Sequence, residues 1–238
     1  MKKLNVNRYA VVFLLSVFSV LYSSCARILH KPAKTKRVAG IFYPPAPDTA
    51  RIQYLTSISG SACMGNGTRF ATFILDPEDE STMEKPYGIS MRNGQLYVCD
   101  PGIGGLEILD FKNGKYINFV PGGVGALKSP LNCFADKNDY LYVADPGRRE
   151  LVIFDSVRNY VGKISDTGSF KPTDVMVYDN EIWVTNPDNH RLNVYDKHTH
   201  ELIRYFAEQY GPGDDGFLYS PFNVYVTPDV IYITDFGD

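Results

Sequence analysis

Acidic and amide side chains occupy seven of the eight positions that lie at two fixed distances after four prolines, and their chemistry suits a polar ligand. The first position lies two residues after each proline, and the second closes an apolar run 14 or 15 residues after it. Carboxylate and amide oxygens can coordinate Ca²⁺ or another divalent cation, or accept hydrogen bonds from sugar hydroxyls. The candidate ligand face comprises Asn132, Asp174, Asn223, Asp100, Asp145, Asn186 and Asp235.

A structural role for these residues competes with the ligand interpretation. Asp and Asn side chains commonly accept hydrogen bonds from the backbone N–H groups of their own turns. The two positions recur in every repeat, whereas a ligand site normally breaks such symmetry, so we favour the structural role. We therefore expect no cofactor, the alternative being a divalent cation such as Ca²⁺ held by Asp174 and the neighbouring Asn residues.

The histidines argue against a metal-dependent active site on the inner strands. Zinc- or iron-dependent sites need two or three imidazoles aimed into one cavity. His30 lies near the amino terminus and His190 in a polar turn. His198 and His200 fall in what we expect to be an outer hairpin. No Ser–His–acid or Cys–His set can be assembled from the repeats, so we predict no catalytic residue and expect a binding protein rather than an enzyme.

An internal repeat supplies the elements that must position these residues. Four similar segments begin at residues 85, 129, 171 and 220. Their anchoring prolines, spaced 44, 42 and 49 residues apart, are Pro86, Pro130, Pro172 and Pro221. Each segment contains short runs rich in β-branched and aromatic residues, separated by polar turns such as residues 92–94. Four antiparallel strands in about 40–45 residues make one blade of a β-propeller.

The repeats predict an all-β fold with three complete four-stranded blades and a partial fourth in residues 85–238. Within the repeats, Cys99 and Cys133 align with small apolar positions and are expected to lie in the core. Residues 51–84 are expected to hold a lone entry strand at 51–58 and an acidic linker. Closed propellers contain four to eight blades, so we expect a truncated product that lacks two to three blades.

The detail of the repeats resembles the NHL-repeat family of β-propellers. Residues 186–196 lie close to that family's signature between the second and third strands, with Arg191 before the third strand. Glu150 and Gly105 replace this arginine in the two preceding repeats. The Gly-rich residues 211–217 are similar to the family's inter-blade loop. The resemblance implies a six-bladed ring at full length, and it says little about function because this fold hosts many activities.

The first 24 residues are typical of a secretory signal. A basic start precedes an apolar run at residues 10–22, which is too short to cross a hydrocarbon layer of about 30 Å as a helix. Two small residues then precede Cys25, and this arrangement resembles the lipobox of bacterial lipoproteins. The resemblance implies cleavage before Cys25, acylation of that residue and, because no Asp follows it, sorting to the outer membrane. An uncleaved anchor with an unmodified thiol is the alternative.

The segment after Cys25 and the net charge complete the prediction. Residues 25–50 are basic and then Pro-rich, as in an extended tether. Without residues 1–24 the chain holds 21 basic and 27 acidic side chains, a net charge of −6. This charge and the signal disfavour nucleic-acid partners, including the RNA that some NHL proteins bind.

We therefore expect a lipid-anchored protein of the bacterial cell envelope that faces the periplasm or the cell surface. Its predicted role is to bind an unknown protein or carbohydrate partner. The expected partner surface is the candidate ligand face together with the loops at residues 122–129 and 211–220. The alternative is a metal-dependent propeller enzyme of the lactonase or lyase kind, with its site on the channel axis.

Overall fold

The structure is a computed structural model that describes residues 41–45, 47–49, 51–61, 81–166 and 169–237. The chain divides into two units, residues 1–57 and residues 58–238. The predicted signal, Cys25 and most of the predicted tether and acidic linker lie outside the described residues. Within the described ranges, no helix is long and apolar enough to span a membrane.

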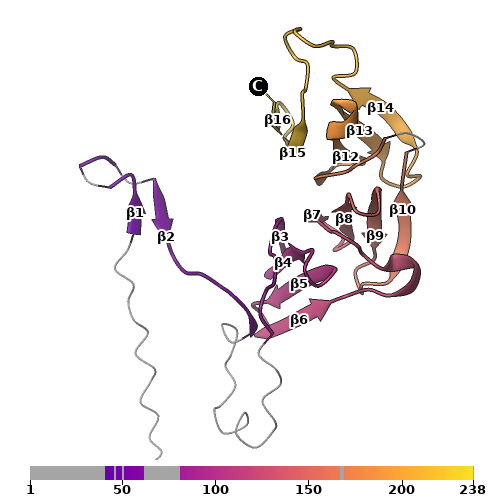
Figure 1. Cartoon of the computed structure of the whole chain (residues 1–238). Helices are drawn as coiled ribbons and strands as arrows, with labels where there is room; N and C mark the ends of the chain where they lie inside the picture. The colour runs from indigo at the N-terminus through magenta and orange to yellow at the C-terminus, as the bar shows by residue number, and fades with distance from the viewer. Residues whose placement is uncertain (1–40, 46, 50, 62–80, 167–168, 238) are drawn as a thin grey trace, which may run out of the picture. The chain divides into compact units, whose positions relative to one another are not determined.

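The described part of the first unit is a short antiparallel hairpin (Figure 1). Strand β1 (Ile41–Tyr43) pairs with β2 (Ile52–Tyr54), and every residue of the two strands is exposed. The sequence predicts the second strand but leaves it without a partner. The structure adds its pairing with β1. The sequence does not predict β1, because residues 41–43 precede two prolines and fall in the predicted tether.

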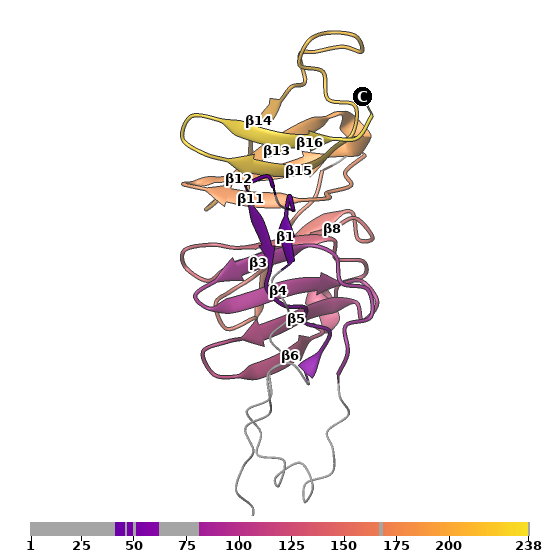
Figure 2. The ribbon, with the colours of Figure 1, turned by 90° about the vertical axis from the view of Figure 1, so that its left-hand side faces the viewer.

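The second unit contains four antiparallel sheets, one for each repeat (Figures 1 and 2). Blade 1 consists of β3 (Ile89–Arg92), β4 (Gln95–Asp100), β5 (Gly105–Asp110) and β6 (Lys115–Phe119). Blade 2 consists of β7 (Asn132–Ala135), β8 (Leu141–Asp145), β9 (Glu150–Phe154) and β10 (Tyr160–Ile164). Blade 3 consists of β11 (Val175–Tyr178), β12 (Glu181–Asn186), β13 (Arg191–Asp196) and β14 (Leu202–Phe206). Blade 4 consists of β15 (Pro221–Val226) and β16 (Ile231–Asp235), which confirms three complete blades and a partial fourth.

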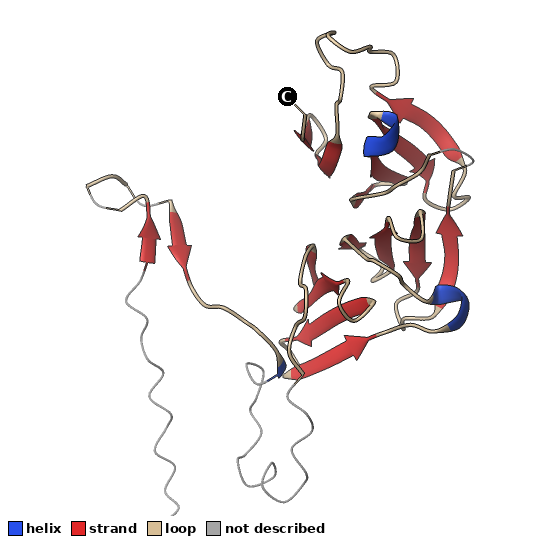
Figure 3. Ribbon diagram, viewed as in Figure 1, coloured by secondary structure: helices blue, strands red, loops and turns tan. Residues whose placement is uncertain are grey.

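Tight turns join consecutive strands because the sequence places suitable residues there. Arg92 of β3 pairs with Gln95 of β4, so only two residues form the loop between them. Asn93 and Gly94 both have positive φ angles, 50° and 78°. A two-residue hairpin loop with this backbone matches the twist of the flanking strands, and Asn–Gly tolerates it best. Two short 3₁₀ helices, η2 (Gly123–Gly125) and η3 (Pro187–Asn189), lie in longer loops (Figure 3).

The hydrophobic core of the second unit lies between successive blades. One cluster joins blades 1 and 2 and includes Leu106 and Phe154. A second cluster joins blades 2 and 3, and a third joins blades 3 and 4. The first strands of the blades, β3, β7, β11 and β15, contact one another in this order, and Figure 1 shows β3 and β7 at the inner edges of their sheets. Blades 2 and 3 therefore bury apolar side chains on both faces, as the repeat predicts for neighbouring blades.

Candidate functional site

The residues that close the second strands bind the loop that leads into their own blade. Asp145, which is fully buried, shows the pattern most clearly. Its carboxylate accepts hydrogen bonds from the backbone N–H groups of Lys128 (2.7 Å), Ser129 (3.0 Å) and Arg148 (3.0 Å). These three donors belong to two loops, so one carboxylate fixes the entry to the blade and the turn after β8 together.

The other three closing residues make equivalent bonds. Asp100 accepts from the N–H groups of Glu84 and Lys85 (2.7 and 2.9 Å). In blade 3 the residue is Asn186, which accepts from the N–H of Lys171 (3.4 Å). Asp235 accepts from the N–H groups of Tyr219 (2.7 Å) and Ser220 (2.5 Å). The structure keeps these four side chains in their separate blades, and their observed partners are backbone groups.

The residues two positions after the prolines connect each blade to the next, and we call residues 88, 132, 174 and 223 the inter-blade clasp. The N–H of Gly88 donates to the carbonyl oxygen of Leu131 in blade 2 (2.8 Å). The Asn132 side-chain amide donates to the carbonyl oxygen of Thr173 in blade 3 (3.1 Å). These bonds explain why the position takes a residue that is small or polar.

The third link of the clasp brings two of the predicted site residues together. One carboxylate oxygen of Asp174 accepts from the N–H of Val224 (2.9 Å) and from the side-chain amide of Asn223 (3.4 Å). Burial raises the pKa of Asp174 to about 6, and the hydrogen bonds from Val224, Val175 and Asn223 oppose this rise only in part. Among the described residues, no group of three His, Cys, Asp or Glu side chains could hold a metal ion. A ligand role for the clasp stays a prediction, since its observed bonds are structural.

Gly88 is the member of the clasp that leaves no space for a side chain. A Cβ added there would lie 1.7 Å from the Asn132 side-chain oxygen and 2.4 Å from the Leu131 carbonyl oxygen. The variant G88A should therefore lower the free energy of unfolding by about 2 kcal/mol, because blades 1 and 2 must separate locally. Urea denaturation measures this cost. Gly122→Ala is the control, because its added Cβ meets open space, and equal stability of the two variants would contradict the expectation.

His30 lies outside the described residues, and the described histidines and repeat cysteines lie where the sequence places them. His190 follows η3 in a left-handed conformation with φ of 55°. His198 and His200 lie in the turn between β13 and β14, the outer hairpin of blade 3. Cys99 and Cys133 are free, buried members of the core between blades 1 and 2.

The sequence reasoning missed a series of aromatic rings at the blade ends where the closing residues lie. We call it the aromatic row, and its members are Tyr87, Phe222, Phe236, Tyr219, Phe217 and His190. Tyr87 at the start of blade 1 lies 6.3 Å from Phe222 of blade 4, and Phe222 lies 5.2 Å from Phe236, both measured between ring centroids. Tyr87 and Phe236 are 55% and 64% exposed, so partner molecules can reach these rings.

The other members of the aromatic row form a second group of rings around the loop before β15. Phe217 lies 4.8 Å from Tyr219 and 5.3 Å from His190, again between ring centroids. A ring nitrogen of His190 lies 2.6 Å from the Tyr219 carbonyl oxygen and so fixes the loop to blade 3. The sequence carries only a weak signal for the aromatic row, because aromatic residues directly follow the anchoring prolines in the first and fourth repeats only. Phe217 and Tyr219 belong to the 211–220 loop that the sequence assigns to the partner surface.

Comparisons with known proteins identify the architecture. No protein-family model and no curated protein sequence matches the chain. It is similar to the structure of a streptogramin B lyase, with a TM-score of 0.51 and 15% identity over 63% of this chain and 48% of the other. It is also similar to virginiamycin B lyase from Staphylococcus aureus, with a TM-score of 0.50 and 12% identity over 63% and 49% of the two chains.

A catalytically inactive virginiamycin B lyase from the same organism, solved with quinupristin, gives a TM-score of 0.51 at 14% identity. The chain spans about half the length of these structures. Identities this low show the fold alone. Together with the four radial sheets, the comparisons establish that residues 85–237 form part of a β-propeller.

Proposed function

We propose that the protein is a membrane-anchored, extracytoplasmic β-propeller of NHL type that acts as a binding or scaffold module for a protein or glycan partner. The aromatic row is the observation that carries this proposal. Aromatic side chains supply large contact areas with few rotatable bonds, and they are enriched at the centres of binding surfaces. Backbone bonds to the closing residues Asp100 and Asp235 fix the segments that carry Tyr87 and Tyr219, so these rings are held in place before a partner arrives.

Tyr87 is the member to test, because it is exposed and its removal leaves the hydrophobic core intact. We expect Y87A to weaken partner binding at least about tenfold, as truncation of an aromatic anchor usually does. A photo-crosslinking analogue at Phe236, in cells that produce the full chain, identifies the partner, and titration with that partner gives the affinity. Tyr232→Ala, which removes an exposed ring outside the row, is the control. Equal affinities of the two variants would refute a role for the row.

The anchoring part of the proposal rests on the signal-like segment and the small residues before Cys25. Labelling of growing cells with a palmitate analogue tests it. Cys25→Ala should abolish the label, whereas Cys63→Ala should retain it. Label that persists in the Cys25 variant would exclude acylation at this position.

A metal-dependent propeller enzyme is the second candidate function. Asp174 favours it because this carboxylate immediately precedes the inner strand β11 and burial raises its pKa to about 6. The similar structures are also lyases by name. Elemental analysis of the purified chain separates the candidates. Stoichiometric calcium or zinc that is lost in Asp174→Ala supports the enzyme, and a metal-free protein that chelators do not destabilise supports the binding module.

A further inference from the structure

A groove lies between blades 2 and 3, away from the aromatic row. It consists of two cavities of about 310 and 260 Å³. His200 lines both cavities and forms the wall that they share. The His200 ring lies over Gly162 of β10, where an added Cβ would be 3.6 Å from the ring. The larger cavity has the size of a site for a small ligand.

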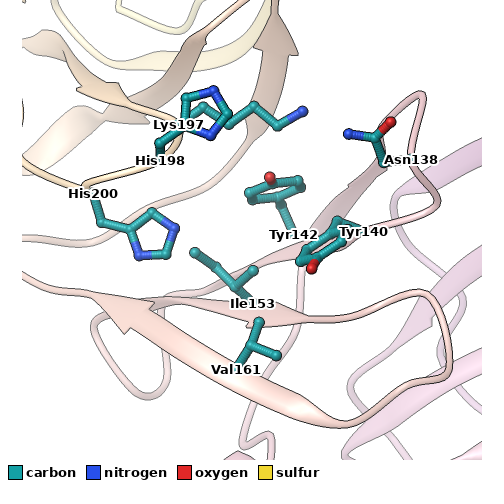
Figure 4. A pocket seen from close by; sticks show the side chains of 8 residues that line it. All are labelled: Asn138, Tyr140, Tyr142, Ile153, Val161, Lys197, His198 and His200. Carbon is teal, nitrogen blue, oxygen red and sulfur yellow. The ribbon is translucent and has the colours of Figure 1, made fainter.

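The groove is lined by turns that the carboxylates of Asp136 and Asp196 hold in place. Figure 4 shows Lys197, His198 and His200 of the β13–β14 hairpin facing the tyrosines of blade 2. The Asp196 carboxylate accepts a hydrogen bond from the His198 N–H (2.8 Å) and thereby orders this hairpin. On the opposite wall, the Asp136 carboxylate accepts hydrogen bonds from the N–H groups of Asn138 and Tyr140 (2.8 and 2.9 Å). Both walls are therefore formed before any ligand binds.

The charges in the groove favour a neutral ligand. Lys197 forms an ion pair with Asp136 at 2.5 Å, and the two side chains are only 8% and 2% exposed. Lys163, which lines the smaller cavity, forms an ion pair with Glu150. Each lysine thus already has a carboxylate partner, and Glu150 is shared between Lys163 and Arg148. A phosphate or carboxylate ligand would have to compete with these partners and would also meet Asp166 in the smaller cavity.

The remaining lining combines apolar faces with neutral hydrogen-bonding groups. Tyr140 and Val161 line the larger cavity and are 37% and 47% exposed. Burial lowers the pKa of His200, so its imidazole is neutral at pH 7 and offers one donor and one acceptor. The Asn138 amide offers both as well. A pyranose ring has complementary chemistry, because its C–H face is apolar and each hydroxyl both donates and accepts.

We propose that this groove binds a neutral oligosaccharide, with one sugar ring in each cavity and the linkage between them passing His200. Tyr140 and Val161 contact the C–H face of the first ring, and Asn138 and His200 bond its hydroxyls. The site is separate from the aromatic row and does not depend on the function proposed for that row.

The test uses the purified full chain on an array of neutral and acidic oligosaccharides, followed by calorimetric titration of the best neutral sugar. We expect saturable binding with a Kd of about 1 mM or tighter and no competition by inorganic phosphate. Tyr140→Ala and His200→Asn should each weaken binding at least about tenfold, since each removes a ring from the cavity lining. Asn tolerates the left-handed backbone at position 200, where φ is 60°.

One control variant and a comparison with Y87A make the outcomes decisive. Tyr232→Ala should bind the sugar with unchanged affinity, because Tyr232 does not line the groove. Loss of sugar binding in Y87A but not in Tyr140→Ala would overturn this inference while supporting the aromatic row as the glycan site. An array without saturable neutral ligands, or a preference for acidic sugars, would overturn it outright.

Discussion

The Asp174 carboxyl group should make the wild-type protein lose up to about 3 kcal/mol of stability as the pH rises from 4 to 7. Replacing Asp174 with asparagine should abolish this loss. Burial raises the pKa of this carboxyl group from 3.8 to about 6. Because the folded state binds the proton more tightly than the unfolded state, protonation of Asp174 stabilises the fold. The contribution is complete below pH 3.8 and is lost as the pH rises through 6. At about 1.4 kcal/mol for each pH unit between these values, the loss approaches 3 kcal/mol.

Urea denaturation of the wild type and D174N at a series of pH values measures this difference. Other carboxyl groups titrate in both proteins, so their contributions cancel when the two free energies of unfolding are subtracted. The difference should change between pH 4 and 7 and remain constant above pH 7.5. Parallel pH curves would show that Asp174 titrates near its ordinary pKa.

Asp155→Asn supplies a control of opposite sign. Hydrogen bonds from Asn159 and Val157 lower the pKa of the Asp155 carboxyl group. The stability that it contributes is therefore present above its ordinary pKa and is lost as the pH falls. D174N should therefore remove a loss of folding stability that occurs as the pH rises, whereas Asp155→Asn should not.

Removal of the Asp145 carboxylate should cost still more, about 4 kcal/mol in D145A. The backbone N–H groups of Lys128 and Ser129 would lose their acceptor at a fully buried position, and the N–H of Arg148 would keep only the backbone carbonyl oxygen of residue 145. Each unsatisfied buried donor costs about 1–3 kcal/mol. Chemical denaturation or the shift in Tm reports the loss.

Two further variants keep this expectation testable even if D145A fails to fold. D145N should cost less than half as much, because Asn186 shows that an amide can serve at this position. Asp235→Ala should also cost less, because Asp235 is only partly buried and water can reach the N–H groups that it would leave. Equal losses in the alanine variants at positions 145 and 235 would contradict our account of buried donors.

The repeat predicts the strands because their signals are local. Alternating apolar residues, Asn–Gly turns and the regular interval from proline to closing acid specify each hairpin without reference to distant residues. The bonds of the closing residues follow from the same local signals, since Asp145 binds loops of its own blade.

Contacts between blades were not predictable in the same way. The bond from Val224 to Asp174 joins residues 50 positions apart, and it depends on the angle at which two blades pack. Tyr87 meets Phe222 only because blades 1 and 4 converge near the axis. The groove likewise combines turns of two blades, and neither turn alone carries a pattern typical of a binding site.

The inter-blade clasp has a mechanical consequence. Its bonds run from Gly88 to Leu131, from Asn132 to Thr173 and from Asp174 to Val224, so each link spans a single interface. Stability in such an array approximates a sum of nearest-neighbour terms. Amide protons in β8, β9, β12 and β13, whose blades have described neighbours on both sides, should therefore exchange with solvent most slowly. The groove between blades 2 and 3 lies between two such blades, so it should be among the last features of the described array to open on heating.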